Sequence, residues 1–205
     1  QPSNTPVKNT PTPADTATPL PPTGTQGPTP IPTIDIFGGG QTTIRDDFES
    51  LAGWYTGSSD NFLVEFLEGG YHFVVDMITG PAPVYSIRQT SLGDILVSID
   101  VMRFDGKDGG YFGVMCRYAD AANYYRFVVY TDGEYEIAKK VGGVFTSLTR
   151  EELEEPLLID GSPNNILASR VGDSLKLYLN DELVADLEDR DLTAGYIGII
   201  AGADL

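Results

Sequence analysis

The chain of 205 residues has one cysteine, one histidine and one tryptophan. A single cysteine excludes a disulfide within the chain and a metal site made of several thiolates. Cys116 lies in the apolar run YFGVMCRY, where we expect a buried and unreactive thiol. His72 lies in YHFVVD, where we expect a side chain of a sheet rather than a general base. The scarcity of these residue types argues against thiol chemistry and against a Ser-His-Asp triad.

Basic residues and long apolar runs are also scarce. The chain has 13 Lys and Arg against 30 Asp and Glu, which gives a net charge of −17. Such a charge repels nucleic acids and anionic lipid surfaces. No apolar run approaches the roughly 18 residues that a membrane helix needs. We therefore expect no nucleic acid partner and no membrane insertion.

Proline is plentiful at the N-terminus, where ten of the 14 prolines lie in residues 1–33. Each proline fixes φ and lacks a backbone N–H, so we expect an extended tail with polyproline II geometry. Tracts of Thr and Pro are typical of O-glycosylated stalks, and the alternative is a plain flexible linker. The candidate glycosylation sites are Thr10, Thr12, Thr18 and Thr29. A chain that begins at Gln1 in such a tract resembles a trimmed mature form, so we expect an extracellular or cell-surface protein.

The segment 34–42 joins the tail to the rest of the chain. Its first residues alternate apolar and polar side chains like a short strand, and three glycines follow as a hinge. Such a strand could add to a sheet of a neighbouring subunit, or it could be the first edge strand of its own sheet. In the first alternative the assembly segment consists of Ile34, Ile36, Phe37, Gly38, Gly39 and Gly40.

The pattern of residues 43–205 predicts a single all-β domain. Short β-rich runs alternate with turn signals such as Asp132-Gly133 and Gly142-Gly143. The one helix-like run is TREELEEPL, which Pro156 cuts short. About twelve antiparallel strands in a domain of this length fit a two-sheet sandwich of jelly-roll type.

Three stretches carry a resemblance to a known family. They are DDFES…GW, GYFGVMCRYADAANYYRFVVYTDGEYEIAKKVGG and NILASRVGDSLKLYLNDELVADLEDRDLTAGYIGIIAG. With them, residues 43–205 resemble the concanavalin A-like, laminin-G-like jelly-roll domains of bacterial secreted or surface proteins. The resemblance implies the fold. It leaves the function open, because the family includes glycan-binding proteins, glycoside hydrolases, adhesion modules and structural domains.

The sequence offers no catalytic residues. A glycoside hydrolase needs two carboxylates across a cleft, and the E-x-D-x-x-E strand of the glucanases with this fold is missing. The acids of EYEIA, Glu134 and Glu136, and those of REELEE are expected to be solvated surface groups. We therefore predict that the protein is not an enzyme.

The sequence offers two sets of binding residues. Jelly-roll domains that resemble this one often bind calcium through carboxylates, and the candidates here are Asp46, Asp47 and Asp204. No other cofactor is expected. A glycan site needs exposed aromatic rings, and the candidates are Trp54, Tyr124 and Tyr125. The last two are neighbours on one predicted strand, so one of them is expected to point outward.

Two functional hypotheses of different classes fit the sequence. In the first, the protein is a non-catalytic structural subunit that assembles head to tail with copies of itself into a fibre or surface layer, through its N-terminal tail and strand. In the second, it is a carbohydrate-binding or adhesion module displayed on a stalk. The glycine-hinged strand and the missing catalytic set favour the first hypothesis.

Overall fold

The computed structural model describes residues 46–48, 53–67, 69–75, 83–102, 109–158 and 161–203. The chain divides between Ile44 and Arg45 into two units, and every described residue belongs to the second. The predicted tail, the predicted segment 34–42 and Asp204 lie outside the described residues. The O-glycosylation and assembly residues named above belong to those parts and stay predictions.

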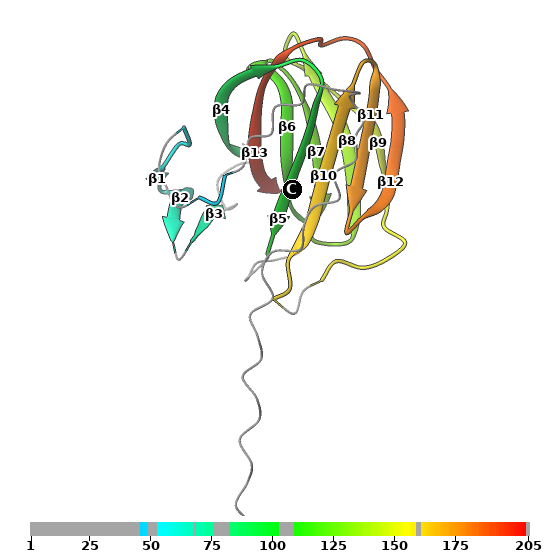
Figure 1. Ribbon diagram of the computed structural model, residues 1–205. Helices are drawn as coiled ribbons and strands as arrows, with labels where there is room; N and C mark the ends of the chain where they lie inside the picture. Colours follow the sequence, from blue (N-terminus) through cyan, green and yellow to red (C-terminus); the bar gives the residue numbers. More distant parts are fainter. Residues whose placement is uncertain are drawn as a thin grey trace, which may run out of the picture. The chain divides into compact units, whose positions relative to one another are not determined.

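The described residues form thirteen strands and no helix (Figure 1). Runs rich in Val, Ile, Tyr and Phe favour strands, and turn residues separate them. No helix long and apolar enough to cross a membrane occurs in this part of the chain. In chain order the strands are β1 (Gly57–Ser59), β2 (Phe62–Leu67), β3 (Gly70–Val75), β4 (Val84–Leu92), β5 (Ile95–Val101), β6 (Gly110–Asp120), β7 (Asn123–Tyr130), β8 (Glu134–Val141), β9 (Val144–Glu152), β10 (Asn164–Val171), β11 (Ser174–Leu179), β12 (Glu182–Glu188) and β13 (Gly195–Ala203).

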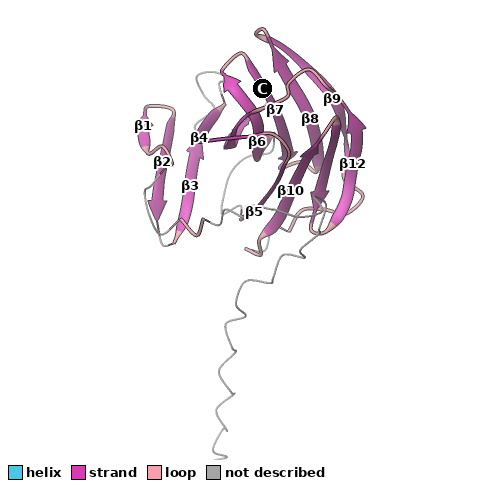
Figure 2. Ribbon diagram, turned by 45° about the horizontal axis from the view of Figure 1, so that its top comes forward, coloured by secondary structure: helices cyan, strands magenta, loops and turns pink. Residues whose placement is uncertain are grey.

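The strands form three antiparallel sheets (Figure 2). The largest has six strands in the order β4-β13-β6-β7-β8-β9, and the second has four in the order β12-β11-β10-β5. These two sheets lie face to face as two layers, and β1-β2-β3 is a small third sheet. The predicted all-β, two-sheet jelly-roll sandwich is confirmed.

Two of the turns show why the chain folds back where it does. Gly142 and Gly143 connect β8 to β9 with φ angles of 57° and 84°. Asn180 and Asp181 connect β11 to β12 with φ angles of 50° and 71°. Two successive positive φ angles are the geometry of a type I′ hairpin turn, which Gly, Asn and Asp adopt most readily. These residues therefore fix the register of the two hairpins.

The main hydrophobic core lies between the six-stranded and the four-stranded sheet. Alternate residues of each strand point into it, and each fully buried Leu, Ile, Val or Phe stabilises the fold by about 1.5–3 kcal/mol. Cys116 is fully buried there, as expected, and burial raises the pKa of its thiol to about 12. The buried members of the main core are Ile95, Val114, Cys116, Tyr125, Phe127, Val129, Tyr135, Ile137, Ile166, Ala168, Leu175, Leu177, Leu179 and Ala185.

One expectation about the strands was wrong, and strand β4 was missed. The run TREELEEPL is not helical, because its residues up to Glu152 belong to β9, which pairs with β8. Pairing along a whole neighbouring strand outweighs the weak helix preference of Glu, Arg and Leu. Strand β4 was not predicted because its second half is polar, although it pairs with β13 at the edge of the six-stranded sheet.

Candidate functional site

The candidate site lies on the outer face of the six-stranded sheet, which is the face turned away from the main core. Tyr125 of β7 points into the main core, whereas its neighbour Tyr124 is buried on the outer face. A second buried cluster forms on that face, made of Tyr111, Met115, Tyr124, Val128, Tyr130 and Ile200. Burial on both faces explains why the β7 sequence, NYYRFVVY, is apolar almost throughout.

Three polar side chains form a hydrogen-bond network within this cluster. Arg126 donates through Nη2 to Oε2 of Glu136 at 2.5 Å and to the hydroxyl of Tyr130 at 3.2 Å. The Tyr130 hydroxyl donates to the same Glu136 oxygen at 3.0 Å. Arg126 is 6% exposed and Glu136 2%, so the two charges form a buried ion pair. We call these three residues the outer-face network.

Aromatic rings enclose the guanidinium group of Arg126. Its Cζ lies 4.7 Å from the ring centre of Tyr111 and 4.4 Å from that of Phe145. Burial alone would lower the pKa of Arg126, but the charge of Glu136, the nearby Tyr111 and Tyr130 and the hydrogen bond to Glu136 together outweigh burial, and the pKa is raised. The Nε of Arg126 has no hydrogen-bond acceptor among the described residues. The face thus holds a permanently charged group with one unmatched donor inside an aromatic frame.

The side chains above and beside the network are more exposed. Phe145 of β9 is 45% exposed, although it packs over Arg126. Arg150 of β9 stacks on Tyr130, with 4.0 Å between its Cζ and the ring centre, and pairs with Glu134 at 2.6 Å. We call Phe145, Arg150 and Glu134 the rim. A ligand from solvent can reach the rim, and the buried network holds the rim in place.

The sequence analysis missed the outer-face network and was wrong about one of its members. Glu136 was expected to be solvated, but it is buried against Arg126. The acids of REELEE, by contrast, are exposed as expected. Arg126 itself was the available signal, because a charged residue inside an apolar strand needs a buried partner.

Asp46, a predicted calcium ligand, is engaged in other contacts. Its carboxylate accepts hydrogen bonds from Nε1 of Trp54 at 2.8 Å and from the backbone N–H of Phe48 at 3.0 Å, and it forms an ion pair with Arg88. Burial would raise the pKa of Asp46, but these bonds outweigh it and the pKa lies below its ordinary value of 3.8. Asp46 therefore connects Trp54 to strand β4.

The other two predicted calcium ligands give no further support for a calcium site. Asp47 is exposed, and Asp204 lies outside the described residues. Within the described ranges, no group of three or more His, Cys, Asp and Glu could hold a metal ion. Calcium binding stays a prediction.

The predicted aromatic contacts lie in three different places. Trp54 stands among other rings, 5.8 Å from the centroid of Phe48 and 5.8 Å from that of Tyr71. Tyr125 lies in the main core, where its hydroxyl donates to Asp189. Of the three, Tyr124 is the one on the outer face, and it stacks on Tyr118 at 6.2 Å. Their contact with a glycan stays a prediction.

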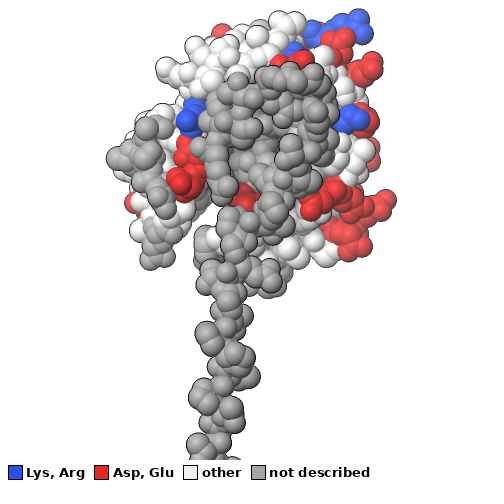
Figure 3. Space-filling model, viewed as in Figure 1, with Lys and Arg blue, Asp and Glu red and all other residues white. Residues whose placement is uncertain are grey.

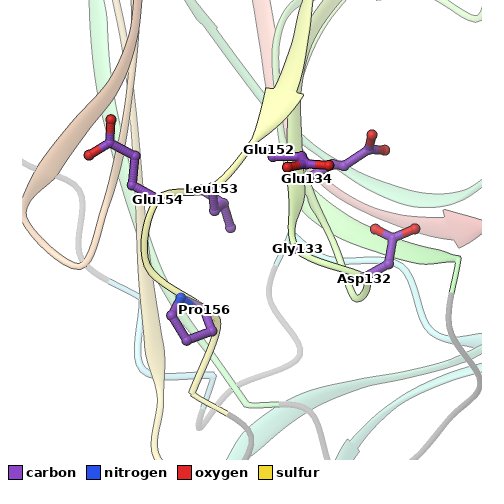
Figure 4. Close-up of a pocket in the computed structure, with 7 residues that line it drawn as sticks. All are labelled: Asp132, Gly133, Glu134, Glu152, Leu153, Glu154 and Pro156. Atoms are coloured by element: carbon purple, nitrogen blue, oxygen red, sulfur yellow. The ribbon is translucent and has the colours of Figure 1, made fainter.

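A hollow of about 520 Å³ lies beside the rim, between the β7–β8 turn and the end of β9 (Figure 4). Its acidic lining residues are Asp132, Glu134, Glu152 and Glu154. Glu154 lies on the side opposite Glu134 and Glu152, so the carboxylates do not converge on one point. Further groups of acidic side chains appear on the face shown in Figure 3. The acidic lining of the hollow disfavours an anionic ligand near the rim.

Comparison with solved structures of other proteins supports the jelly-roll fold. No family model and no curated protein matches the chain. Among solved structures, the carbohydrate binding module CBM66 from Bacillus subtilis is similar with a TM-score of 0.61 and 22% identity, over 74% of this chain and 88% of that chain. A protein of unknown function with a galectin-like fold, also from Bacillus subtilis, has a TM-score of 0.54 and 13% identity, over 70% of this chain and 80% of that chain.

An enzyme has a similar fold as well. The glycoside hydrolase family 16 endo-glucanase from Bacteroides ovatus has a TM-score of 0.54 and 8% identity, over 77% of this chain and 85% of that chain. At such identities the likeness shows the fold alone. The chain thus has a jelly-roll sandwich like that of a carbohydrate binding module and of an endo-glucanase, and the choice between binding and catalysis rests on the site itself.

Proposed function

We propose that the protein is a non-catalytic carbohydrate-binding module whose site is the rim and network on the outer face of the six-stranded sheet. The observation that carries the proposal is an exposed aromatic ring, Phe145, that packs over the buried Arg126–Glu136 pair, on the same strand as the exposed Arg150, which pairs with Glu134. The likeness in fold to CBM66 supports it.

The chemistry of the rim suits a neutral sugar. One face of a sugar ring presents C–H groups that pack on an aromatic ring, while its hydroxyls need donors and acceptors around them. Phe145 offers the ring, Arg150 donates and Glu134 accepts. Hydroxyls both donate and accept, so a neutral sugar can bridge this pair without changing its charge balance. The net charge of −17 disfavours an acidic sugar.

Catalysis is the less favoured alternative. A glycoside hydrolase uses one carboxyl group as a general acid and a second as nucleophile or base. On the described part of this face, Glu136 pairs with Arg126 and Glu134 pairs with Arg150. These two carboxylates are thus committed to ion pairs, and the acids of the neighbouring hollow do not converge on one point (Figure 4), which suits binding better than proton transfer.

The proposal also gives a role to the rest of the chain. Residues 43–205 are the binding domain, and residues 1–33 are an extended linker that displays it outside a bacterial cell. Assembly into a fibre through the segment 34–42 stays a prediction, because no contact among the described residues tests it. Carbohydrate binding does not require such assembly.

Binding of the full chain to a panel of neutral polysaccharides, followed by affinity electrophoresis, tests the proposal. Once a ligand is found, Phe145→Ala should weaken its binding about tenfold, because loss of one stacked ring removes about 1.4 kcal/mol. Tyr178→Ala is the matched control, since Tyr178 lies on β11 of the other sheet, facing away from the main core. The proposal fails if no neutral polysaccharide binds, or if both variants weaken binding equally.

A further inference from the structure

Two buried arginines lie together at one end of the main core. Arg117 of β6 is 3% exposed and Arg170 of β10 is 1% exposed. Both donate to the carbonyl oxygen of Leu192, Arg117 through Nη1 at 2.7 Å and Arg170 through Nη2 at 3.5 Å. Because one oxygen accepts from both, the two guanidinium groups are close neighbours. Burial and the charge of Arg170 lower the pKa of Arg117.

The backbone brings Arg117 to this position in an unusual conformation. Its φ is 50°, in the left-handed region that residues other than glycine seldom adopt. It lies where the pairing of β6 with β7 is irregular, between Cys116 and Asp120. Cys116 already points into the main core, so regular alternation would point the next side chain outward. The irregularity turns Arg117 inward instead, beside Arg170.

The two positive charges are only partly matched within the protein. Arg117 pairs with Asp94 at 3.2 Å, and the side chain of Asp94 is about half exposed. Arg170 forms no ion pair with a described residue; its Nη2 donates to the backbone carbonyl of Asp189 at 2.6 Å. The carboxylate of Asp189 is itself paired with Lys139. Arg170 is therefore a buried cation without a carboxylate partner in the described part of the chain.

Three donor nitrogens of the two arginines are unmatched as well. Nε of Arg117 and both Nε and Nη1 of Arg170 are buried and have no acceptor among the described residues. Nearly all buried donors in folded proteins find an acceptor, because an unmatched one is strongly unfavourable. A left-handed residue, two adjacent like charges and three unmatched donors coincide here. A bound anion would account for all of them.

We propose that a small monovalent anion of the halide class binds between Arg117 and Arg170. The ion accepts hydrogen bonds from the unmatched N–H groups and supplies the negative charge that Arg170 lacks. Burial favours a monovalent ion over sulfate or phosphate, because desolvation penalises a double charge more strongly. We call this place the arginine site. It lies within the main core and is independent of the proposed carbohydrate site.

Unfolding of the full chain at constant ionic strength tests the proposal, with sodium chloride replacing sodium gluconate stepwise. A ligand that binds only the folded state raises the ratio of folded to unfolded protein in direct proportion to its concentration, once that exceeds the Kd. We expect this rise with chloride and with bromide, whereas sulfate should give no more than the non-specific stabilisation that comes from its exclusion from the protein surface. An equal response to all of these salts would overturn the proposal.

A pair of variants sharpens the test. Arg170→Met removes two of the three unmatched donors and should abolish the chloride dependence. Arg190→Met removes the same charge from a side chain that is 76% exposed, so its chloride dependence should equal that of the unchanged protein. A chloride dependence that survives in Arg170→Met would contradict the assignment.

Crystals of the unchanged protein grown in sodium bromide test anion binding at the arginine site even if the Arg170→Met variant does not fold. Anomalous scattering from bromide within contact distance of Arg117 and Arg170 would support the site. A water molecule at that position, or bromide at the surface alone, would overturn it.

Discussion

The outer-face network and the arginine site both bury guanidinium groups, but they satisfy them differently. In the network, Arg126 has a carboxylate partner, Glu136, which is as deeply buried as the arginine. In the arginine site, Arg170 has backbone carbonyls and the ring of Tyr125, with no described carboxylate. A buried charge can thus be neutralised by a counter-charge within the fold, as in the network, or it can lack such a partner, as in the arginine site, where it favours binding of a ligand. We call the first kind of site closed and the second kind open.

The difference has a local origin in the strands. Arg126 on β7 lies opposite Ala138, and Glu136 lies opposite Val128, so regular pairing of β7 with β8 puts both charges diagonally on one face. Arg117 reaches its place only through an irregular pairing. The closed site therefore results from regular strand pairing, and the open site results from irregular strand pairing.

Removing the counter-charge from the closed network should have the largest effect on stability. Glu136→Gln leaves Arg126 buried without a counter-charge, which should lower the free energy of unfolding by about 3–5 kcal/mol. The double variant Arg126→Met with Glu136→Leu removes both charges and should recover most of that loss. Urea unfolding measures both. A Glu136→Gln variant as stable as the unchanged protein would show that the network is not a closed ion pair.

Removing Arg170, the arginine of the open site, should lower the free energy of unfolding by a smaller amount. Arg170→Met leaves backbone carbonyls unmatched but no buried carboxylate, so we expect a loss of about 2 kcal/mol in chloride-free buffer. The loss should grow when chloride is added, because only the unchanged protein gains a ligand. If Arg170→Met costs as much as Glu136→Gln without chloride, the contrast between the two sites is wrong.

The ion pair between Asp189 and Lys139, beside the arginine site, should make a smaller contribution to stability, and this contribution should depend on pH. Burial would raise the pKa of Asp189, but hydrogen bonds from Lys139 and Tyr125 outweigh it, and the pKa lies below 3.8. The stability that Asp189 contributes is therefore present above pH 3.8 and is lost as the pH falls through the lower pKa of the folded state.

Asp189→Asn tests this dependence. It should be less stable than the unchanged protein by about 1 kcal/mol at neutral pH, since it loses one partly buried ion pair. Urea unfolding at a series of acidic pH values should show the difference shrinking toward zero. A difference that stays constant with pH would contradict the role of the Asp189 charge.

The local parts of the fold were predictable from the sequence. The turns at Gly142-Gly143 and Asn180-Asp181 depend on φ preferences of single residues, and the strands on alternation over a few positions. The end of β9 was not predictable in this way, because its Glu-rich sequence becomes a strand only by pairing with β8.

The two buried charge sites were harder to predict for different reasons. The network requires that the outer face of β7 be buried, which depends on packing across several strands rather than on the sequence of any one of them. The arginine site requires a left-handed residue at Arg117, where no glycine or asparagine marks an irregular strand. Alternation alone would have placed Arg117 on the opposite face of β6.

The central claim is that the outer face of the six-stranded sheet binds carbohydrate, and chemical-shift mapping of the ¹⁵N-labelled full chain tests it most directly. With a neutral oligosaccharide that the protein binds, the account predicts amide shifts concentrated in β8 and β9, around Glu134, Phe145 and Arg150. Shifts concentrated in β10, β11 and β12 of the other sheet would contradict the claim.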